Sequence, residues 1–202
     1  MIVQVGSALA YRSIPYQSAY CAAKHAIEGF TEALRAELLH DRSRVRVTSV
    51  HLPALNTPQF GWMRTRLSRK PQPVPPIFQP ELAARAIVFA AEHPRRELWV
   101  GGSTVRALVG NKLAPGLLDR YLARGGYDAQ QTDDAIDTDR ADNLFDPPPG
   151  DRGAHGIFDA ESRASSLQLT IALHRRSTTA AIVSGAAAAA LLALGRRMTR
   201  TR

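Results

Sequence analysis

Two kinds of hydrophobic pattern alternate along the first part of the chain. A short apolar run at residues 2–5 (IVQV) is typical of a buried strand and ends at Gly6. Apolar residues at helical spacing follow from Ser18 to about His40, and the β-branched run at residues 45–51 (VRVTSVH) predicts a second buried strand. A strand, a long helix and a strand in this order indicate a parallel crossover, and hence an α/β fold.

The predicted long helix has two chemically different sides. Its apolar side carries residues at helical spacing, namely Ala22, Ala26, Phe30, Ala33, Leu34 and Leu38. The wetter side carries the charged residues Glu28, Glu32, Arg35 and Glu37. We therefore expect an amphipathic helix with these two sides.

Further elements follow up to residue 125. Residues 53–80 form a Pro-rich loop, and loops of that length without regular structure are often functional. Pro80 and Pro94 bracket a helix expected at residues 81–93. A short strand is expected at residues 98–100, and one or two helices at residues 105–125 with an interruption at Pro115–Gly116.

The pattern divides the chain into three regions. Residues 1–127 form the predicted α/β domain. Residues 128–165 are acidic and Pro-rich, and we interpret them as a poorly ordered linker. Residues 166–202 are predicted to form an Ala-rich helix with basic flanks.

The charge distribution excludes a nucleic-acid-binding protein. The net charge is +8, but six arginines and no acid lie between Ala172 and the end of the chain. Residues 128–161 carry ten acids against two arginines. A nucleic-acid groove needs a basic stripe with stacking aromatic residues on a folded surface, and the sequence has none.

The C-terminal region leaves two alternatives open. Residues 178–194 are seventeen uncharged residues between arginine pairs. A helix of that length spans roughly 26 Å, slightly less than a bilayer core of about 30 Å. It either contacts a membrane or packs on the domain or a dimer partner. The first residues lack a secretory pattern, and the single cysteine, Cys21, fits a reducing compartment, so we expect a cytoplasmic protein with membrane association through this helix as the alternative.

Ser7, Tyr20 and Lys24 carry the candidate chemistry. Tyr20 and Lys24 are four residues apart and so lie on one side of a helix. A nearby ammonium lowers the pKa of a phenol, which brings proton transfer into range. Ser7, at the end of the first strand, supplies a hydroxyl for the oxygen that gains or loses this proton. These groups suit the interconversion of an alcohol and a carbonyl.

The segment VQVGSALAYRSIPYQSAYCAAKHAIEGFTEALRAEL resembles the active-site segment of the short-chain dehydrogenase/reductase family. The resemblance is specific over residues 1–57 and extends to about residue 102. It implies that Tyr20 is the catalytic acid and base, that Lys24 binds the nicotinamide ribose, and that Ser7 orients the substrate carbonyl. Tyr20 and Lys24 would thus both take part in catalysis and bind the cofactor, which would be NAD or NADP; Lys24 would also lower the pKa of Tyr20.

The segment LPALNTP after the second strand corresponds to a cofactor-binding stretch of that family, although Ala54 stands where the family has glycine. The resemblance implies that Thr57 contacts the nicotinamide; its alternative role is a turn or cap before Pro58. The Pro-rich loop would be the substrate loop, with an apolar pocket lined by Phe60, Trp62, Met63 and Ile77. The alternative interpretation of its PQPVPP run is a polyproline ligand. Cys21, His25 and His51 are expected to pack or face solvent, and no metal site is expected.

The resemblance also implies what the sequence does not contain. The family binds the cofactor pyrophosphate at a glycine-rich turn in the first half of the domain, and this turn is absent from the sequence. We therefore expect a partial, doubly wound Rossmann-like sheet without its N-terminal cofactor-binding half. The function would be that of a truncated NAD(P)-dependent oxidoreductase, inactive as given and homodimeric when whole. An in-frame upstream extension with a glycine-rich turn would support this reading. The alternative is a non-catalytic interaction or membrane-associated module derived from a reductase.

Overall fold

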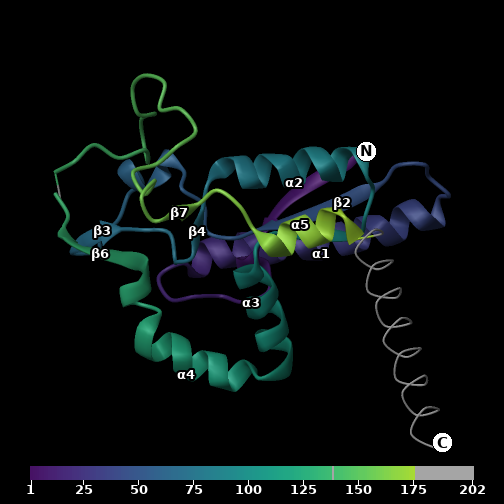
Figure 1. Ribbon diagram of the computed structural model, residues 1–202, viewed down its shortest axis with the longest axis horizontal. Coiled ribbons are helices and arrows are strands. Elements are labelled where there is room, and N and C mark those ends of the chain that lie inside the picture. Colours follow the sequence, from purple (N-terminus) through teal and green to yellow (C-terminus); the bar gives the residue numbers. More distant parts are fainter. Residues whose placement is uncertain (138, 176–202) are drawn as a thin grey trace, which may run out of the picture.

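A parallel three-stranded sheet forms the centre of the protein. The computed structural model describes residues 1–137 and 139–175 (Figure 1). The strands β1 (Ile2–Ser7), β2 (Val47–Leu52) and β5 (Glu97–Trp99) lie in the order β1-β2-β5. Strand β2 pairs in parallel with both neighbours, and its register with β1 sets Ser7 beside Leu52. The predicted α/β fold with a parallel sheet is therefore confirmed.

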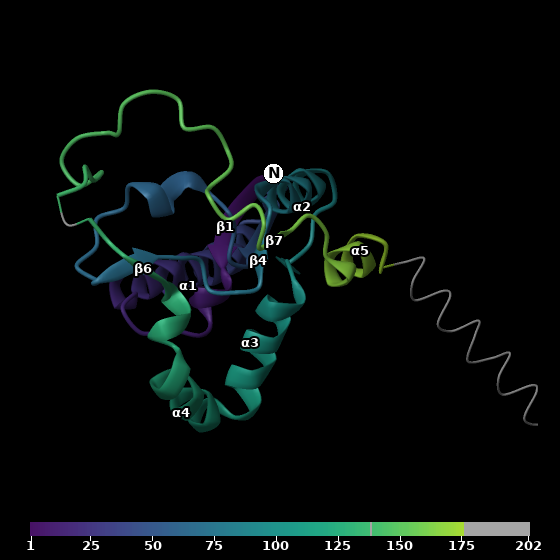
Figure 2. The ribbon, with the colours of Figure 1, turned by 60° about the vertical axis from the view of Figure 1, so that its left-hand side comes forward.

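Helices cover both faces of the sheet. Helix α1 (Ser18–His40) joins β1 to β2, and α2 (Pro80–Glu92) precedes β5. The apolar core lies between the sheet and the helices α2 and α5 (Leu167–Leu173). Figures 1 and 2 show these helices from two sides. Its buried members are Val50, Phe78, Leu82, Ala86, Ala90, Leu98, Val100 and Leu169.

The opposite face of the sheet is polar, and the predicted sides of α1 are wrong at several positions. Glu28 and Thr31 are buried against the sheet, whereas Phe30 is 60% exposed. Ala22, Ala26 and Ala33 are exposed as well. The physical reason lies in β2 and β5, whose side chains facing α1 include Ser49, His51 and Glu97, so polar groups of the helix find partners there.

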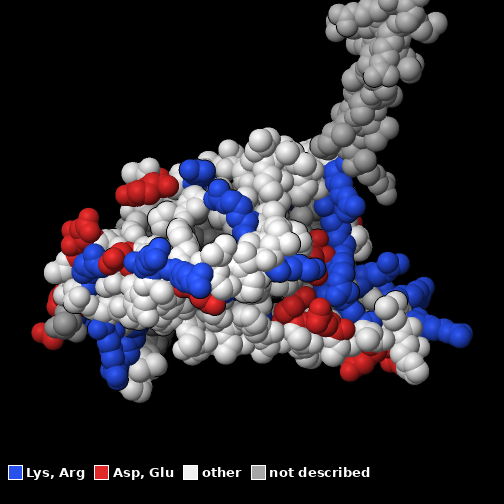
Figure 3. Space-filling view, turned by 90° about the horizontal axis from the view of Figure 1, so that it is seen from below, with Lys and Arg blue, Asp and Glu red and all other residues white. Residues whose placement is uncertain are grey.

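Shorter elements complete the described chain. They are η1 (Ala8–Ala10), η2 (Pro58–Gly61), β3 (Arg69–Pro71), β4 (Ile77–Phe78), α3 (Gly102–Leu113), α4 (Pro115–Gly125), η3 (Asp128–Gln130), β6 (Gln131–Ala135) and β7 (Ser162–Arg163). The break between α3 and α4 falls at Ala114, just before the predicted Pro115–Gly116. Basic and acidic side chains are interspersed over the face of the molecule seen from below (Figure 3).

The acidic segment 128–165 is not a disordered linker, which corrects the prediction. Strand β6 pairs antiparallel with β3, and β7 pairs in parallel with β4, so the segment folds back over the Pro-rich loop. Ion pairs accompany this pairing. Asp128 and Asp133 lie beside Arg69, and Lys70 lies 3.1 Å from Asp134, so acids of one strand meet bases of the other.

The start of the predicted third region also belongs to the core. Ser166 caps α5 by accepting a hydrogen bond from the Leu169 amide, and Leu169 is 2% exposed. The helix therefore packs with residues 1–127 and is not part of a separate tail. Residues 178–194 lie outside the described residues. Within the described ranges, no helix is long and apolar enough to cross a membrane.

Candidate functional site

Ser7 lies at the carboxyl end of β1, where the strand passes into η1. Its side chain is buried, and its Oγ accepts a hydrogen bond of 3.1 Å from the Leu9 amide. Gly6 is required beside it, because a Cβ at that position would lie 2.6 Å from Nδ1 of His51. The close approach of Gly6 to His51 fixes the strand end that presents Ser7.

Tyr20 and Lys24 lie in the first two turns of α1 and face the same strand end. Lys24 Nζ donates a hydrogen bond of 3.2 Å to the carbonyl oxygen of Val5. The same ammonium lies 5.6 Å from the centroid of the Tyr20 ring. Hydrogen bonding between the Tyr20 hydroxyl and the Ser7 side chain acts on the pKa of Tyr20. The structure therefore brings Ser7, Tyr20 and Lys24 together.

The pKa of Tyr20 is raised above its ordinary value in this chain. Tyr20 is 46% exposed, and partial burial of the phenol is the main cause; hydrogen bonding with Ser7 opposes it only in part. The expectation that Lys24 lowers this pKa below its ordinary value is therefore not met here; the Lys24 ammonium is turned toward the Val5 carbonyl. At neutral pH, Tyr20 is a neutral phenol.

Thr57 lies one loop beyond the carboxyl end of β2. It occupies the N-cap position of η2, and its side chain makes no capping hydrogen bond there. Its backbone carbonyl is in close contact with Gly156, in the C-terminal segment. The structure thus places Thr57 at the carboxyl edge of the sheet, the same edge that carries Ser7, but in contact with a different part of the chain.

The predicted pocket residues also contact the C-terminal segment. Phe60 packs edge-to-face on Phe158, with ring centroids 6.0 Å apart. The Arg152 guanidinium lies 5.6 Å from the centroid of the Trp62 ring, and the carbonyl oxygen of Met63 accepts a hydrogen bond from Arg140. Ile77, on β4, is buried. A segment of the chain that the sequence assigned to a linker therefore covers the predicted substrate loop.

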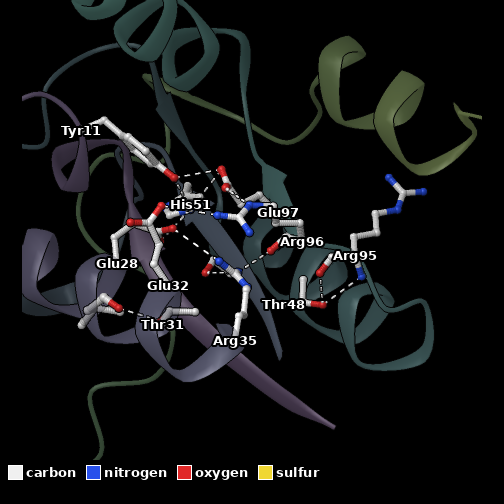
Figure 4. A network of polar contacts seen from close by, with 12 residues as sticks. Tyr11, Glu28, Thr31, Glu32, Arg35, Thr48, His51, Arg95, Arg96 and Glu97 are labelled. Atoms are coloured by element: carbon white, nitrogen blue, oxygen red, sulfur yellow. Dashed lines mark hydrogen bonds and ion pairs between the residues drawn. The ribbon is translucent and has the colours of Figure 1, made fainter. Parts of the chain in front are cut away.

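A buried polar network on the α1 side of the sheet was not predicted (Figure 4). Glu97 accepts hydrogen bonds of 2.9 Å from both the Tyr11 hydroxyl and the Trp99 indole. His51 Nε2 lies 3.1 Å from the Tyr11 hydroxyl and 3.5 Å from the Glu28 carboxylate. Because Tyr11 follows η1 and His51 touches Gly6, the network surrounds the strand end that carries Ser7.

Burial sets the pKa values in this network. It lowers the pKa of His51 and raises those of Tyr11 and Glu28. Burial would also raise the pKa of Glu97, but the hydrogen bonds from Trp99 and Tyr11 outweigh it and the pKa is lowered. The sequence contained one indication of this polar network: Ser49 and His51 are two residues apart on β2 and therefore face the same side of the sheet.

Comparisons with known proteins agree with the geometry around β1 and α1. Residues 1–67 match the family model described as short chain dehydrogenase. The uncharacterized oxidoreductase YxnA of Bacillus subtilis is 32% identical over 187 residues, which are 91% of this chain and 51% of that protein. The putative oxidoreductase SadH of Mycobacterium tuberculosis is 50% identical over 56 residues, 28% of this chain and 20% of that protein. The chain thus spans about half the length of YxnA.

One solved structure is also similar. It is a short chain dehydrogenase from Burkholderia cenocepacia J2315 in complex with NADP, 30% identical, with a TM-score of 0.45 over 60% of this chain and 46% of that one. The family model over residues 1–67 and the oxidoreductase relatives carry the assignment. Over residues 1–67, this chain is a member of the short-chain dehydrogenase family.

Proposed function

We propose that this chain carries the catalytic residues of an NAD(P)-dependent oxidoreductase that interconverts an alcohol and a carbonyl. The observation behind the proposal is that Ser7, Tyr20 and Lys24 gather at the carboxyl end of β1. In open α/β sheets, ligands bind outside the carboxyl ends of the strands. The proposed site therefore lies where this fold class places its substrates.

Each of the three residues has a distinct proposed role. Tyr20 transfers the proton to or from the substrate oxygen. Its raised pKa keeps the phenol protonated at neutral pH, the form that donates to a carbonyl oxygen during reduction. Ser7 is buried and rigidly held, so its hydroxyl orients the same oxygen. Lys24 lies beside the Tyr20 ring and is proposed to bind the ribose of the cofactor.

The residues present fit one end of a nicotinamide cofactor. An ammonium has three N–H donors, and the Val5 carbonyl takes one from Lys24, which leaves donors for ribose hydroxyls. The Thr57 hydroxyl caps no helix and is available for the nicotinamide amide. When bound, the cofactor would accept or supply the hydride. No glycine-rich turn for its pyrophosphate occurs in the sequence.

We therefore expect the chain by itself to bind NAD and NADP weakly. The nicotinamide end has donors here, but the pyrophosphate, which carries most of the ligand's charge, has no glycine-rich turn to receive it. Calorimetric titration of the chain with each cofactor should show no saturation in the micromolar range. Saturable micromolar binding would contradict the expectation.

The proposed activity is tested in a joined protein, in which the glycine-rich, cofactor-binding half of a short-chain dehydrogenase is placed before this chain. With a panel of alcohols and NAD or NADP, the joined protein should form reduced cofactor, measured by absorbance. Cofactor binding without turnover of any alcohol or carbonyl would instead favour the non-catalytic alternative.

We also propose that the joined protein is a homodimer that pairs through the exposed side of α1. Phe30 and the exposed alanines at positions 22, 26 and 33 line that side. A Phe30→Glu variant should sediment as a monomer, because the substitution places a charge in an apolar interface. Leu39→Glu is the matched control, since Leu39 is 80% exposed on the opposite side of the helix. A dimer that survives Phe30→Glu would contradict the proposal.

A further inference from the structure

Asn56 is a fully buried side chain beside the proposed cofactor residue Thr57. Its relative exposure is 0%, and both atoms of its amide are used. Its Nδ2 donates to Gln79 at 3.2 Å and to Asp159 at 2.8 Å, and its Oδ1 accepts from the Phe158 amide at 3.1 Å. Two of these three partners lie about a hundred residues further along the chain. A buried amide satisfied in this way has one orientation only.

Gly156 brings the distant segment into contact with Thr57 itself. The Gly156 amide donates a hydrogen bond of 3.1 Å to the Asn56 carbonyl. A Cβ at position 156 would lie 2.6 Å from the carbonyl oxygen of Thr57 and 2.6 Å from Oδ1 of Asn56. Only glycine fits this approach without displacing backbone atoms. The close contact ties the conformation of residue 156 to the position of Thr57.

Residues 155–163, called the clasp below, are fastened at both ends. At one end, His155 contacts Glu81 at 2.6 Å. At the other end, β7 pairs with β4, and the Gln79 amide donates to the Arg163 carbonyl at 3.0 Å. Between these ends, Phe158 is 6% exposed and packs on Phe60. The clasp thus spans from the start of α2 across the loop that contains Thr57.

We propose that the clasp is a positioning element of the active site, acting through Asn56 on Thr57 and through Phe158 on the substrate loop. This inference rests on the proposed function, because it assigns the clasp to the same site. The match to YxnA covers 91% of this chain, so the relative's similarity extends well beyond residues 1–67. The clasp would then hold Thr57 at the position where its hydroxyl meets the nicotinamide.

The first test measures amide hydrogen exchange in the full chain, without any cofactor. Gly156→Ala introduces the clashing Cβ, and Phe158→Ala removes the buried ring. Both variants should accelerate exchange of the Asn56 and Phe78 amides about tenfold or more, because these amides hold the Thr57 loop to β4. Exchange in β2 and α1 should stay within about twofold of the original chain.

Ile157→Ala is the matched control for this measurement. Ile157 lies inside the clasp but is 74% exposed, so its loss should leave every amide unchanged. The proposal is overturned by unchanged exchange at Asn56 and Phe78 in both variants. It is equally overturned by faster exchange throughout β2 and α1, since the clasp would then be part of the general core.

The second test uses the joined protein and separates the clasp from the proposed function. Phe158→Ala should raise the cofactor Kd about tenfold and should have no effect on the Kd when Thr57→Ala is already present. An equal effect of Phe158→Ala in both backgrounds would overturn the clasp proposal. If Thr57→Ala alone leaves the cofactor Kd unchanged, the assigned role of Thr57 is wrong. The action of the clasp on the cofactor is then wrong as well, but the hydrogen-exchange test of the clasp is not affected.

Discussion

Replacing Tyr20 with phenylalanine in the joined protein is expected to reduce turnover by about 10³-fold. The substitution removes one oxygen atom, and with it the only group of the proposed trio that is placed to give a proton to the substrate oxygen. The ring remains, so its contact with the Lys24 ammonium persists, and the cofactor Kd should stay within about twofold. The measurement compares kcat with the Kd from a cofactor titration of the same variant.

Tyr16→Phe is the control that separates chemistry from packing. Tyr16 lies four residues before Tyr20, is 57% exposed and packs edge-to-face on Tyr127 with ring centroids 4.8 Å apart. Tyr16→Phe removes the same hydroxyl group as Tyr20→Phe. It should nevertheless change turnover less than about twofold, because Tyr16 has no proposed part in proton transfer. Comparable losses in both variants, or substantial turnover in Tyr20→Phe, would remove the catalytic assignment.

The part of the site that could be predicted from the sequence is the part set by local geometry. Tyr20 and Lys24 share a side of α1 because they are four residues apart, and Ser7 ends a strand because Gly6 and the turn of η1 follow the run at 2–5. The parallel crossover then places the start of α1 over the end of β1. These relations need only helix period, strand length and handedness.

The features of the fold that the sequence did not predict depend on contacts between residues far apart in the chain. Glu28 and Arg35 were predicted on the wetter side of α1 but face the sheet, because they find partners on its polar face. The periodicity of a helix alone does not reveal what the helix packs against. The segment 128–165 has the composition of a linker, but Arg69 and Lys70 pair with three of its acids and Asn56 binds its backbone. Composition describes a segment in isolation, whereas these pairings connect positions about 60 to 100 residues apart.

Replacing Arg35 with methionine is expected to destabilise the joined protein by about 3 kcal/mol. Arg35 is nearly buried and donates hydrogen bonds to Ser49 Oγ at 2.9 Å and to the Arg96 carbonyl at 2.6 Å. Its guanidinium also lies 3.7 Å from the Glu28 carboxylate. Methionine fills much of the same volume but leaves that buried carboxylate without its cation. Urea unfolding at neutral pH measures the loss.

Two further variants decide whether the buried charge is the cause. Arg96→Met removes an arginine whose side chain is 62% exposed, and should change the free energy of unfolding by less than about 0.5 kcal/mol. Glu28→Gln in the Arg35→Met background removes the unpaired charge and keeps the side-chain size. It should recover about 1 kcal/mol or more, as expected for residues in direct contact. Full additivity of the two substitutions would show that Arg35 acts only through Ser49 and the Arg96 carbonyl.

The pH dependence of the Arg35→Met penalty has a definite sign. Burial raises the pKa of Glu28 in the native state, and the Arg35 charge opposes that rise, so the pKa rises further when Arg35 is removed. A carboxyl group with a raised native pKa stabilises the fold below that pKa and loses this contribution as the pH rises through it. The difference in unfolding free energy between Arg35→Met and the original protein should therefore shrink as the pH falls from about 7 to about 5. A difference that stays constant over this range would mean that the ionisation of Glu28 does not contribute to the packing of α1 on the sheet. Hydrogen bonds alone would then hold α1 on the polar face.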